Sequence, residues 1–298
     1  MAVEKFKMVK VIAEIGCNHK GDMEIAKELI SVASRICRAD VVKFQKRCNR
    51  ELLSPAQYDA PHPVPSNAYG QTYGLHREAL EFTVDQHREL MAFCASEKIT
   101  YSTSVWDLTS AKEMAALKPE FLKIPSATNL HWELQEWLCR NYEGDIHVST
   151  GMTTREEIEQ IVRFYEKLGR AKSLVLYSCT SGYPVKFDEI CLLEIGHMKE
   201  LYADRVQAIA FSGHHLGIAA DVAAITLGAT WVERHFTIDR TWKGTDHAAS
   251  LEPDGLRKLC RDLRNVEQAL TMKQTDILDV EQVQRAKLKW RPDLSAVA

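Results

Sequence analysis

The seven-residue segment WVERHFT at 231–237 places three ionisable side chains in succession among bulky residues typical of a β-strand. Alternate residues of a strand face opposite sides, so Glu233 and His235 share one face while Arg234 lies on the other. A carboxylate and an imidazole on one face could belong to a solvated edge. They could equally line a site for metal binding or proton transfer.

Further polar side chains stand at the ends of other strand-like runs. Lysines provide fixed cations for a carboxylate or phosphate, and hydroxyls beside glycine-containing turns provide further donors. His214 and His235 end two neighbouring runs and could bind one divalent ion, whose open positions would be filled by substrate and water. Glu14, on the first run, could complete that shell or move a proton. The remaining candidates are Lys43, Lys123, Ser126, Ser149, Ser181 and Ser212.

Each of these residues alone has a structural explanation, such as an ion-paired edge lysine or a hydrogen-bonded core histidine. Their common position at strand ends favours an active site, because a solvated surface gives no reason for such clustering. The elements that would position them are eight β-rich runs, each followed by helical periodicity. These runs are 9–16, 41–45, 100–105, 121–126, 146–150, 174–179, 206–212 and 231–237.

Strict alternation of strands and helices predicts a parallel sheet, and eight such units predict a closed α/β fold, the (β/α)8 TIM barrel, as a single domain. An open doubly wound sheet is the alternative, but the GxGxxG turn is absent after the first run. After the fifth run, Thr153 and Glu156 are predicted to form a capping box. In such barrels, the site lies at the carboxyl ends of the strands.

We expect the barrel domain to span 1–272, with a long loop at about 46–85 and a polar C-terminal tail at 273–298. The loop is rich in Pro, Tyr, His and Ser, and it is too long for an ordinary connection between a strand and a helix. It should therefore lie at the carboxyl ends of the strands and shape a substrate pocket. The alternative is that the loop has no part in the function.

Composition narrows the class of protein. A net charge of −3 and a pI near 6.4 argue against a nucleic-acid partner. The N-terminal residues show no signal-peptide core, and no run approaches about 18 apolar residues, so we expect no membrane association. The eight cysteines form no CxxC pair, which favours reduced thiols and a cytoplasmic location.

Seven short motifs occur in an order that resembles the sialic acid (N-acetylneuraminate) synthase family. The resemblance covers about residues 9–270, nearly the whole chain, and the linked set is far more specific than any single pattern. The motifs are AEIGCNHKGD, VVKFQ, KIPSA, STGM, CTSGYP, FSGHHLGI and ERHFT followed by GTDHAASLEP.

The resemblance implies a transferase that condenses phosphoenolpyruvate with an aldose similar to N-acetylmannosamine. The products would be a nonulosonic 2-keto acid and phosphate. It also implies a divalent metal, first manganese, with magnesium or cobalt as alternatives. Phosphoenolpyruvate and the aldose are thus the expected partners. The oligomeric state stays open, and a homodimer is one alternative.

The resemblance also assigns roles to individual positions. His214 and His235 match metal ligands, and Glu14 matches the catalytic carboxylate beside the metal. Two lysines, Lys43 and Lys123, are carried over as catalytic residues that hold phosphoenolpyruvate. The positions that match substrate contacts are Gln45, Thr103, Ser126, Ser149, Ser181, Tyr183, Ser212 and Asp246.

Three departures from the family pattern bear on metal and sugar preference. Thr128 and Gly213 stand where family members usually carry Glu and Asp, so negative charge near the metal is lost. We also expect the chain to lack the small antifreeze-like C-terminal domain, whose arginine in the family recognises the N-acetyl group of the sugar. Segment 55–77, through Arg77 or His76, could supply a replacement contact.

Other functions stay open. A class I aldolase or lyase would use a strand lysine, Lys43 or Lys123, as a Schiff base. A metal-dependent barrel hydrolase would usually carry His-x-His on the first strand, where this chain has a single histidine, His19. A non-catalytic homologue that binds sugar or phosphate would retain the fold and the anion-binding residues.

Overall fold

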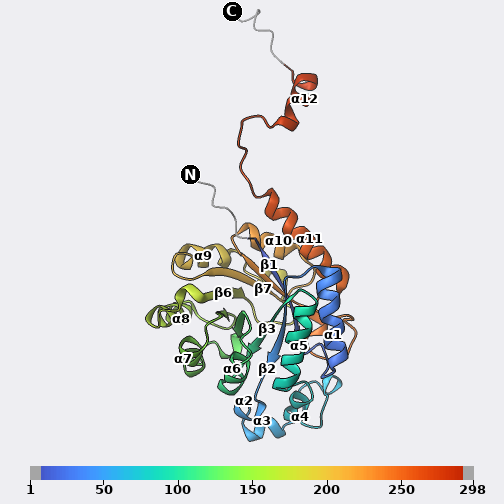
Figure 1. The fold of residues 1–298 in the computed structure, drawn as a ribbon, viewed down its shortest axis with the longest axis vertical. Coiled ribbons are helices and arrows are strands. Elements are labelled where there is room, and N and C mark those ends of the chain that lie inside the picture. Colours follow the sequence, from blue (N-terminus) through green and yellow to red (C-terminus); the bar gives the residue numbers. More distant parts are fainter. Residues whose placement is uncertain (1–7, 291–298) are drawn as a thin grey trace, which may run out of the picture.

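The computed structural model describes residues 8–290. Its strands are all parallel and pair in sequence order, and β8 pairs with β1 to close the barrel. The predicted (β/α)8 barrel is confirmed, with helices around the outside of the strands (Figure 1). The strands are β1 (Lys10–Gly16), β2 (Val41–Lys46), β3 (Thr100–Val105), β4 (Phe121–Ile124), β5 (Asp145–Ser149), β6 (Leu174–Cys179), β7 (Ala208–Gly213) and β8 (Trp231–His235).

Several helices begin where short polar side chains accept hydrogen bonds from free backbone N–H groups. Asp22, Thr83, Asp107 and Thr154 act in this way as N-caps. The main helices are α1 (Met23–Ser31), α5 (Val84–Ser96), α6 (Leu108–Ala115), α7 (Trp132–Asn141), α8 (Arg155–Lys167), α9 (Leu193–Tyr202), α10 (Ala219–Thr226), α11 (Pro253–Ala269) and α12 (Asp279–Leu288). A π-helical turn, η1 (Val32–Cys37), continues α1, and short 3-10 turns are η3 (Ser126–Thr128), η4 (Ala171–Ser173), η5 (Phe187–Glu189) and η6 (His247–Ala249).

The capping box of α8 lies one residue beyond the expected position. Thr154 accepts from the backbone N–H of Glu157, and the Glu157 carboxylate accepts from the N–H of Thr154. The predicted pair, Thr153 with Glu156, is therefore wrong. Thr153 instead donates its hydroxyl to the carbonyl of Gly151.

The strand register decides which side chains enter the barrel. Glu14 of β1 stands opposite Lys43 of β2 and His235 of β8, so the three side chains share the inner face. Two residues beyond Lys43, Gln45 of β2 stands opposite Ser104 of β3. Side chains from distant parts of the sequence are thus brought to the carboxyl ends of adjacent strands.

Two kinds of apolar core hold these strands in place. Most buried apolar residues lie in two large clusters that include both strand and helix side chains, outside the barrel. A smaller cluster fills the barrel interior near the amino ends of the strands, and it consists of Ile12, Val41, Phe121, Val175, Tyr177 and Ala210. The barrel is therefore packed below the site, as expected for this architecture.

The long connection after β2 is folded rather than structureless. It contains α2 (Asn49–Leu52), α3 (Pro55–Asp59), η2 (Pro65–Asn67) and α4 (Tyr73–Glu78), which gather at the end of the barrel opposite to α11 (Figure 1). The hydroxyl of Tyr69 donates to the carbonyl of Lys243, so this segment is tied to the connection that follows β8.

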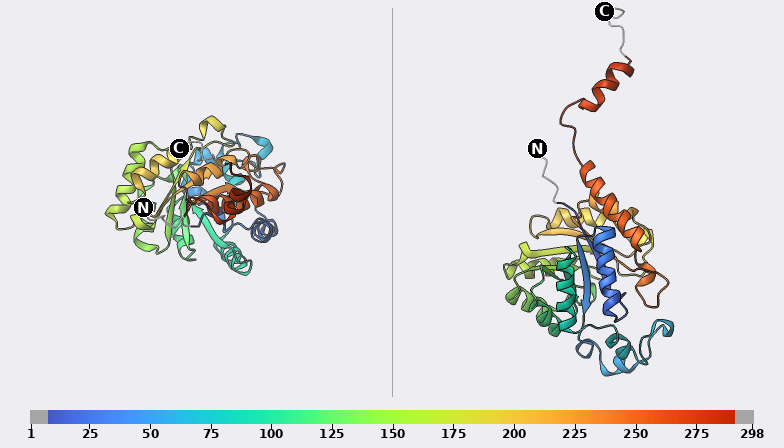
Figure 2. Two further views of the ribbon diagram at one scale, coloured as in Figure 1. Left: turned by 90° about the horizontal axis from the view of Figure 1, so that it is seen from above. Right: turned by 45° about the vertical axis from the view of Figure 1, so that its right-hand side comes forward.

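At the C-terminal end, α12 stands away from the barrel, and none of its residues is buried (Figure 2). The expected tail at 273–298 includes this helix, while positions 291–298, like 1–7, lie outside the described residues. Across 8–290, no helix combines the length and the apolar character needed to span a bilayer.

Candidate active site

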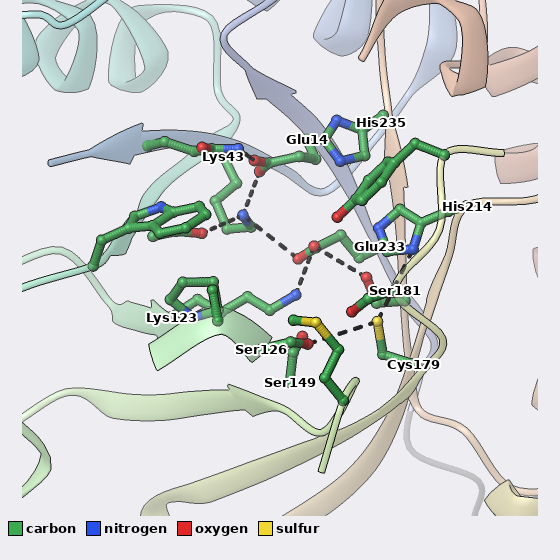
Figure 3. A pocket seen from close by; sticks show the side chains of 18 residues that line it. Glu14, Lys43, Lys123, Ser126, Ser149, Cys179, Ser181, His214, Glu233 and His235 are labelled. Atoms are coloured by element: carbon green, nitrogen blue, oxygen red, sulfur yellow. Dashed lines mark hydrogen bonds and ion pairs between the residues drawn. The ribbon is translucent and has the colours of Figure 1, made fainter. Parts of the chain in front are cut away.

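A cavity of about 320 Å³ opens at the carboxyl ends of the strands. Its lining contains most of the side chains that the sequence singled out, contributed by strands around the whole barrel (Figure 3). The predicted residues that line it are Glu14, Lys43, Gln45, Lys123, Ser126, Ser149, Ser181, Tyr183, Ser212, His214 and His235.

The floor of the cavity is a row of alternating charges. Lys123 Nζ lies 2.6 Å from Glu233 Oε1, and Lys43 Nζ lies 3.8 Å from Glu233 Oε2. Lys43 also forms an ion pair with Glu14, and Gln45 Nε2 donates to Glu14 Oε1 at 2.9 Å. In Figure 3 both lysines reach toward Glu233. These four charged residues are at most 5% exposed, so little water screens their interactions.

The floor charges shift one another's protonation equilibria. Burial raises the pKa of Glu233, but Lys123 and Lys43 outweigh burial and bring that pKa to about 2, so Glu233 stays ionised. Burial lowers the pKa of Lys123, and Glu233 only partly offsets this effect because Lys43 adds a second positive charge nearby. Lys123 thus has one carboxylate partner, Glu233, whereas Lys43 lies between Glu14 and Glu233.

A wall of small polar residues faces this floor. Ser126 Oγ accepts a hydrogen bond from the backbone N–H of Gly151 at 3.0 Å. A Cβ atom at Gly151 would lie 2.7 Å from Ser126 Oγ and even closer to Ser181 Oγ, so only glycine fits between the two hydroxyls. Backbone and hydroxyl donors are therefore concentrated beside the lysines, as anion binding requires.

The two predicted metal ligands come together at the opposite side of the cavity. The ring centroids of His214 and His235 are 5.5 Å apart. His214 Nδ1 lies 3.0 Å from the carbonyl oxygen of Thr180, which fixes the ring and leaves Nε2 available. Burial and then His235 lower the pKa of His214 to about 3, so this imidazole is neutral, as a metal ligand must be.

The donor set fits a divalent transition ion. His235 Nδ1 is buried and has no hydrogen-bond partner among the described residues, as expected of a nitrogen reserved for another ligand. His214 and His235 would hold such an ion with two nitrogens. No group of three or more His, Cys, Asp or Glu side chains suited to a metal was found in 8–290, so further ligands would be water and substrate.

Two predicted contacts lie outside this lining. The expectation for Thr103 is wrong in geometry, because the inward residues of β3 are its neighbours Ser102 and Ser104. Lys43 Nζ donates to Ser104 Oγ at 2.7 Å, so Ser104 takes the place expected of Thr103. Asp246 precedes η6 beyond the cavity wall, although its charge still acts on the half-exposed Tyr183.

The sequence-based candidates missed several lining residues. Glu233 was recognised as inward-facing but was not assigned to the site, although its position two residues before His235 was the available signal. Trp106, Met152 and Cys179 also line the cavity. Burial raises the pKa of the Cys179 thiol, which keeps it protonated. Met152 and Cys179 belong to the motifs STGM and CTSGYP, but their side chains were not singled out, because aromatic and sulfur side chains at strand ends are as common in cores.

Fold and site together define a class of protein: a (β/α)8 barrel enzyme whose pocket joins an anion-binding floor to a histidine pair. The profile of the NeuB family matches residues 29–275. The chain therefore belongs to the NeuB family, the sialic acid synthase family, and is a synthase-type enzyme.

Individual relatives agree with this assignment. The chain is 36% identical over 283 residues to N-acetylneuraminate-9-phosphate synthase from Homo sapiens, covering 93% of this chain and 76% of that protein. It is 33% identical over 267 residues to N,N'-diacetyllegionaminic acid synthase from Campylobacter jejuni, covering 89% and 78%. A crystal structure of N-acetylneuraminic acid synthetase from Leptospira borgpetersenii, in complex with citrate, superposes with a TM-score of 0.79 at 25% identity, covering 98% and 97%.

Proposed function

We propose that the chain condenses phosphoenolpyruvate with an N-acetylmannosamine-like aldose to give a sialic-acid-type 2-keto acid and phosphate. The observation that carries this proposal is the meeting of two buried lysines and a histidine pair in one cavity. The two floor lysines, with hydroxyl donors beside them, suit the carboxylate and phosphate of the enol phosphate. A pair of neutral imidazoles suits a divalent ion, with manganese expected first and magnesium or cobalt as alternatives.

The residues of the chain have distinct tasks in this reaction. Lys43, Lys123 and the hydroxyls of Ser126, Ser149, Ser181 and Ser212 bind the two anionic groups and hold carbon 3 toward the aldehyde carbon. Carbon 3 attacks that carbon, and a water adds to carbon 2 while its proton passes through Glu14 to the new alkoxide. The tetrahedral intermediate then expels phosphate, which takes the proton of the carbon 2 hydroxyl as the keto group forms. Glu14, fixed by Lys43 and Gln45, orients the water and accepts its proton. A divalent ion, when bound, would polarise the aldehyde oxygen.

Glu233 is a positioning residue in this proposal. Its carboxylate contacts both lysines and accepts from Ser212 Oγ at 3.3 Å, so it holds three anion-binding groups in one arrangement before substrate arrives. Such preorganisation avoids reorganisation cost when the enol phosphate binds.

The direct test is phosphate release from phosphoenolpyruvate with a panel of aldoses, with and without manganese. We expect release only when both an acceptor and the metal are present, together with a product that carries three more carbons than the aldose. No release with any aldose would leave a non-catalytic binding protein. Release without an acceptor would indicate a phosphatase instead.

A class I lyase is the second candidate, because burial lowers the pKa of Lys123 and a neutral amine is the form that attacks a carbonyl. Borohydride reduction in the presence of pyruvate, followed by mass analysis of peptides containing Lys43 or Lys123, separates the two reactions. We expect no trapped adduct, because Lys43 and Lys123 are each engaged in an ion pair with a buried carboxylate.

The names of the relatives differ in whether the product carries a phosphate, so they leave open whether the acceptor sugar is phosphorylated. The proteins from Homo sapiens, Mus musculus and Drosophila melanogaster are named for a 9-phosphate product, whereas the Campylobacter protein is named for a product without a phosphate. The proposed condensation is the same chemistry in both cases.

A further inference from the structure

On the outer face of the barrel, behind the histidine pair, lies a buried charged network that the proposed chemistry does not use. Arg234, Asp221 and His215 form this network, and each of the three is at most 1% exposed. Arg234 Nη1 donates to Asp221 Oδ2 at 2.5 Å and lies 3.1 Å from His215 Nε2. It also donates to the carbonyl of Gly217 at 2.8 Å, and Nη2 donates to the carbonyl of His215. One side chain of β8 thus bonds to the backbone that follows β7 and to the first turn of α10.

Each member of the histidine pair is a direct sequence neighbour of this network. His214 precedes His215, and His235 follows Arg234. The last register pair between β7 and β8 joins Gly213 to Arg234, so both histidines of the pair lie one residue beyond the paired part of the two strands. The side chain of Arg234 bridges from β8 to the carbonyl of His215 where this ladder has ended.

The backbone contacts of the two histidines lead to different parts of the barrel. The carbonyl of His214 accepts from the N–H of Val185, in the connection that follows β6. His235 stands opposite Glu14 of β1, and its carbonyl accepts from the N–H of Leu251. These contacts fix each histidine separately and do not join one to the other. The network does join the two strand ends that carry them.

A buried charged network is a costly way to attach a helix to a barrel. Apolar residues of similar size often stabilise a protein as well as a buried ion pair does, and apolar clusters attach the other helices. The network also leaves Asp221 Oδ1, Arg234 Nε and His215 Nδ1 buried without a hydrogen-bond partner among the described residues. A guanidinium instead provides several donors in one rigid plane, and such directional contacts fix the relative position of the groups that they join.

Gly213 provides the space for this arrangement. A Cβ atom at Gly213 would lie 2.8 Å from Cε1 and 2.9 Å from Nδ1 of the His215 ring. The Asp that family members usually carry at this position would therefore displace that ring. The loss of a carboxylate at 213 thus accompanies the packing of His215 against the end of β7.

We propose that Arg234, held by Asp221 and His215, is a positioning residue that sets the separation of His214 and His235 for one divalent ion. This inference rests on the proposed function, in which these two imidazoles bind the metal. Ligands that the surrounding structure already holds in place lose little further freedom when the ion binds, so its affinity is higher. Groups that orient metal ligands typically change metal affinity by about 10- to 100-fold.

The test measures the dissociation constant of manganese in the absence of substrates, from the electron paramagnetic resonance signal of the free ion. Asp221→Asn removes the counter-charge and keeps the shape of the side chain, and it should raise that constant by about 10-fold. It should also lower the midpoint of thermal unfolding, because a buried guanidinium loses its partner.

A double variant separates position from stability. Arg234→Met together with Asp221→Leu replaces the ion pair by apolar side chains of similar size, so the unfolding midpoint should return toward the wild-type value. The manganese dissociation constant should stay about 10-fold above the wild-type value, because the bridge between the strand ends is still missing. Recovery of wild-type affinity in this variant would show that lost stability was the cause and would overturn the inference.

Leu138→Ala is the matched control. Leu138 is fully buried on α7, which lies between β4 and β5 in the chain, on the side of the barrel away from β8. Its loss should lower the unfolding midpoint and leave manganese affinity unchanged, whereas an equal loss of affinity would overturn the inference. Wild-type affinity in Asp221→Asn would overturn it as well. If His235→Ala bound manganese as tightly as the wild-type protein does, the proposed metal site itself would be wrong.

Discussion

The same eight strands build two inner layers of opposite character. On β4, Phe121 lies in the lower layer and Lys123 in the upper one, and on β8, Trp231 and Glu233 are divided in the same way. Each pair is two residues apart, so both members point into the barrel. One layer is aromatic and closely packed, and the other is charged and faces a cavity.

The lower layer is a stack of rings around one buried histidine. His147 lies 3.9 Å from Phe121 between ring centroids at an interplanar angle of 14°, and 4.9 Å from Trp231. His147 Nδ1 is 2.7 Å from the hydroxyl of Tyr177, and burial lowers the pKa of this histidine well below its usual value. The Lys123 ammonium lies 4.2 Å above the Tyr177 ring. The aromatic layer thus excludes water from beneath the ion pairs, where charges interact most strongly.

The largest effect on activity is expected at the histidine pair. His235→Ala removes one of the two proposed metal ligands, and we expect manganese-dependent kcat to fall by about 1,000-fold. His197→Ala, on α9 outside the cavity lining, is the control and should keep wild-type turnover. A manganese titration followed by phosphate release measures both variants. Undiminished turnover in His235→Ala would remove the metal assignment.

The next effect concerns the charged layer. Lys123→Met should lower kcat/KM for phosphoenolpyruvate by about 100-fold, because the substrate anion loses a desolvated cation. Lys112→Met, an exposed lysine on α6, serves as the comparison and should change nothing. Steady-state kinetics at varied phosphoenolpyruvate provide the measurement. A variant with normal affinity and rate would place the substrate anion elsewhere.

A rise in pH should have a smaller effect, a decrease in the affinity for phosphoenolpyruvate. Burial lowers the pKa of Lys123, and only its protonated form binds an anion, so affinity for phosphoenolpyruvate should be full below that pKa and decrease as pH rises through it. Glu233 raises the pKa of Lys123, and Glu233→Gln should therefore move this alkaline decrease to lower pH. Profiles of kcat/KM for phosphoenolpyruvate against pH, measured for the wild-type protein and for Glu233→Gln, test this shift. Alkaline limbs that superimpose would contradict it.

The smallest effect on activity should come from the aromatic layer. Phe121→Ala removes a buried ring, and we expect the free energy of unfolding to fall by about 3–5 kcal/mol. The kcat of the folded fraction should change by less than about threefold, because Phe121 does not line the site cavity. Thermal or denaturant unfolding gives the first quantity and kinetics below the transition gives the second. A large loss of kcat without loss of stability would erase the distinction between the layers.

The sequence was informative where a strand shows alternation. In β8, Glu233 and His235 were expected on one face and Arg234 on the other, and this is confirmed. Arg234 points outward and forms an ion pair with Asp221 of α10 at 2.5 Å. The alternation of eight strand-like runs with helical runs likewise predicted the barrel, and the polar residues at the strand ends include most of the cavity lining.

Other features depend on register that the sequence does not display. Residues 102–104 read Ser-Thr-Ser, so polarity does not reveal which of them point inward until β3 pairs with β2. At the start of α8, two successive threonines are each followed three residues later by a glutamate, so two capping boxes were equally compatible. The placement of segment 46–85 involves contacts with distant segments, such as that of the Tyr69 hydroxyl with the Lys243 carbonyl, and the local sequence does not display these contacts.

The balance of charge on the cavity floor has a thermodynamic consequence. Glu14 and Glu233 cancel Lys43 and Lys123, so the floor alone is electrically neutral. In the proposed reaction, an incoming enol phosphate would make the pocket strongly negative, and a divalent ion held by His214 and His235 would offset that excess. Each of the two ligands should therefore strengthen the binding of the other by the same factor, so neither dissociation constant has meaning unless the concentration of the second ligand is stated.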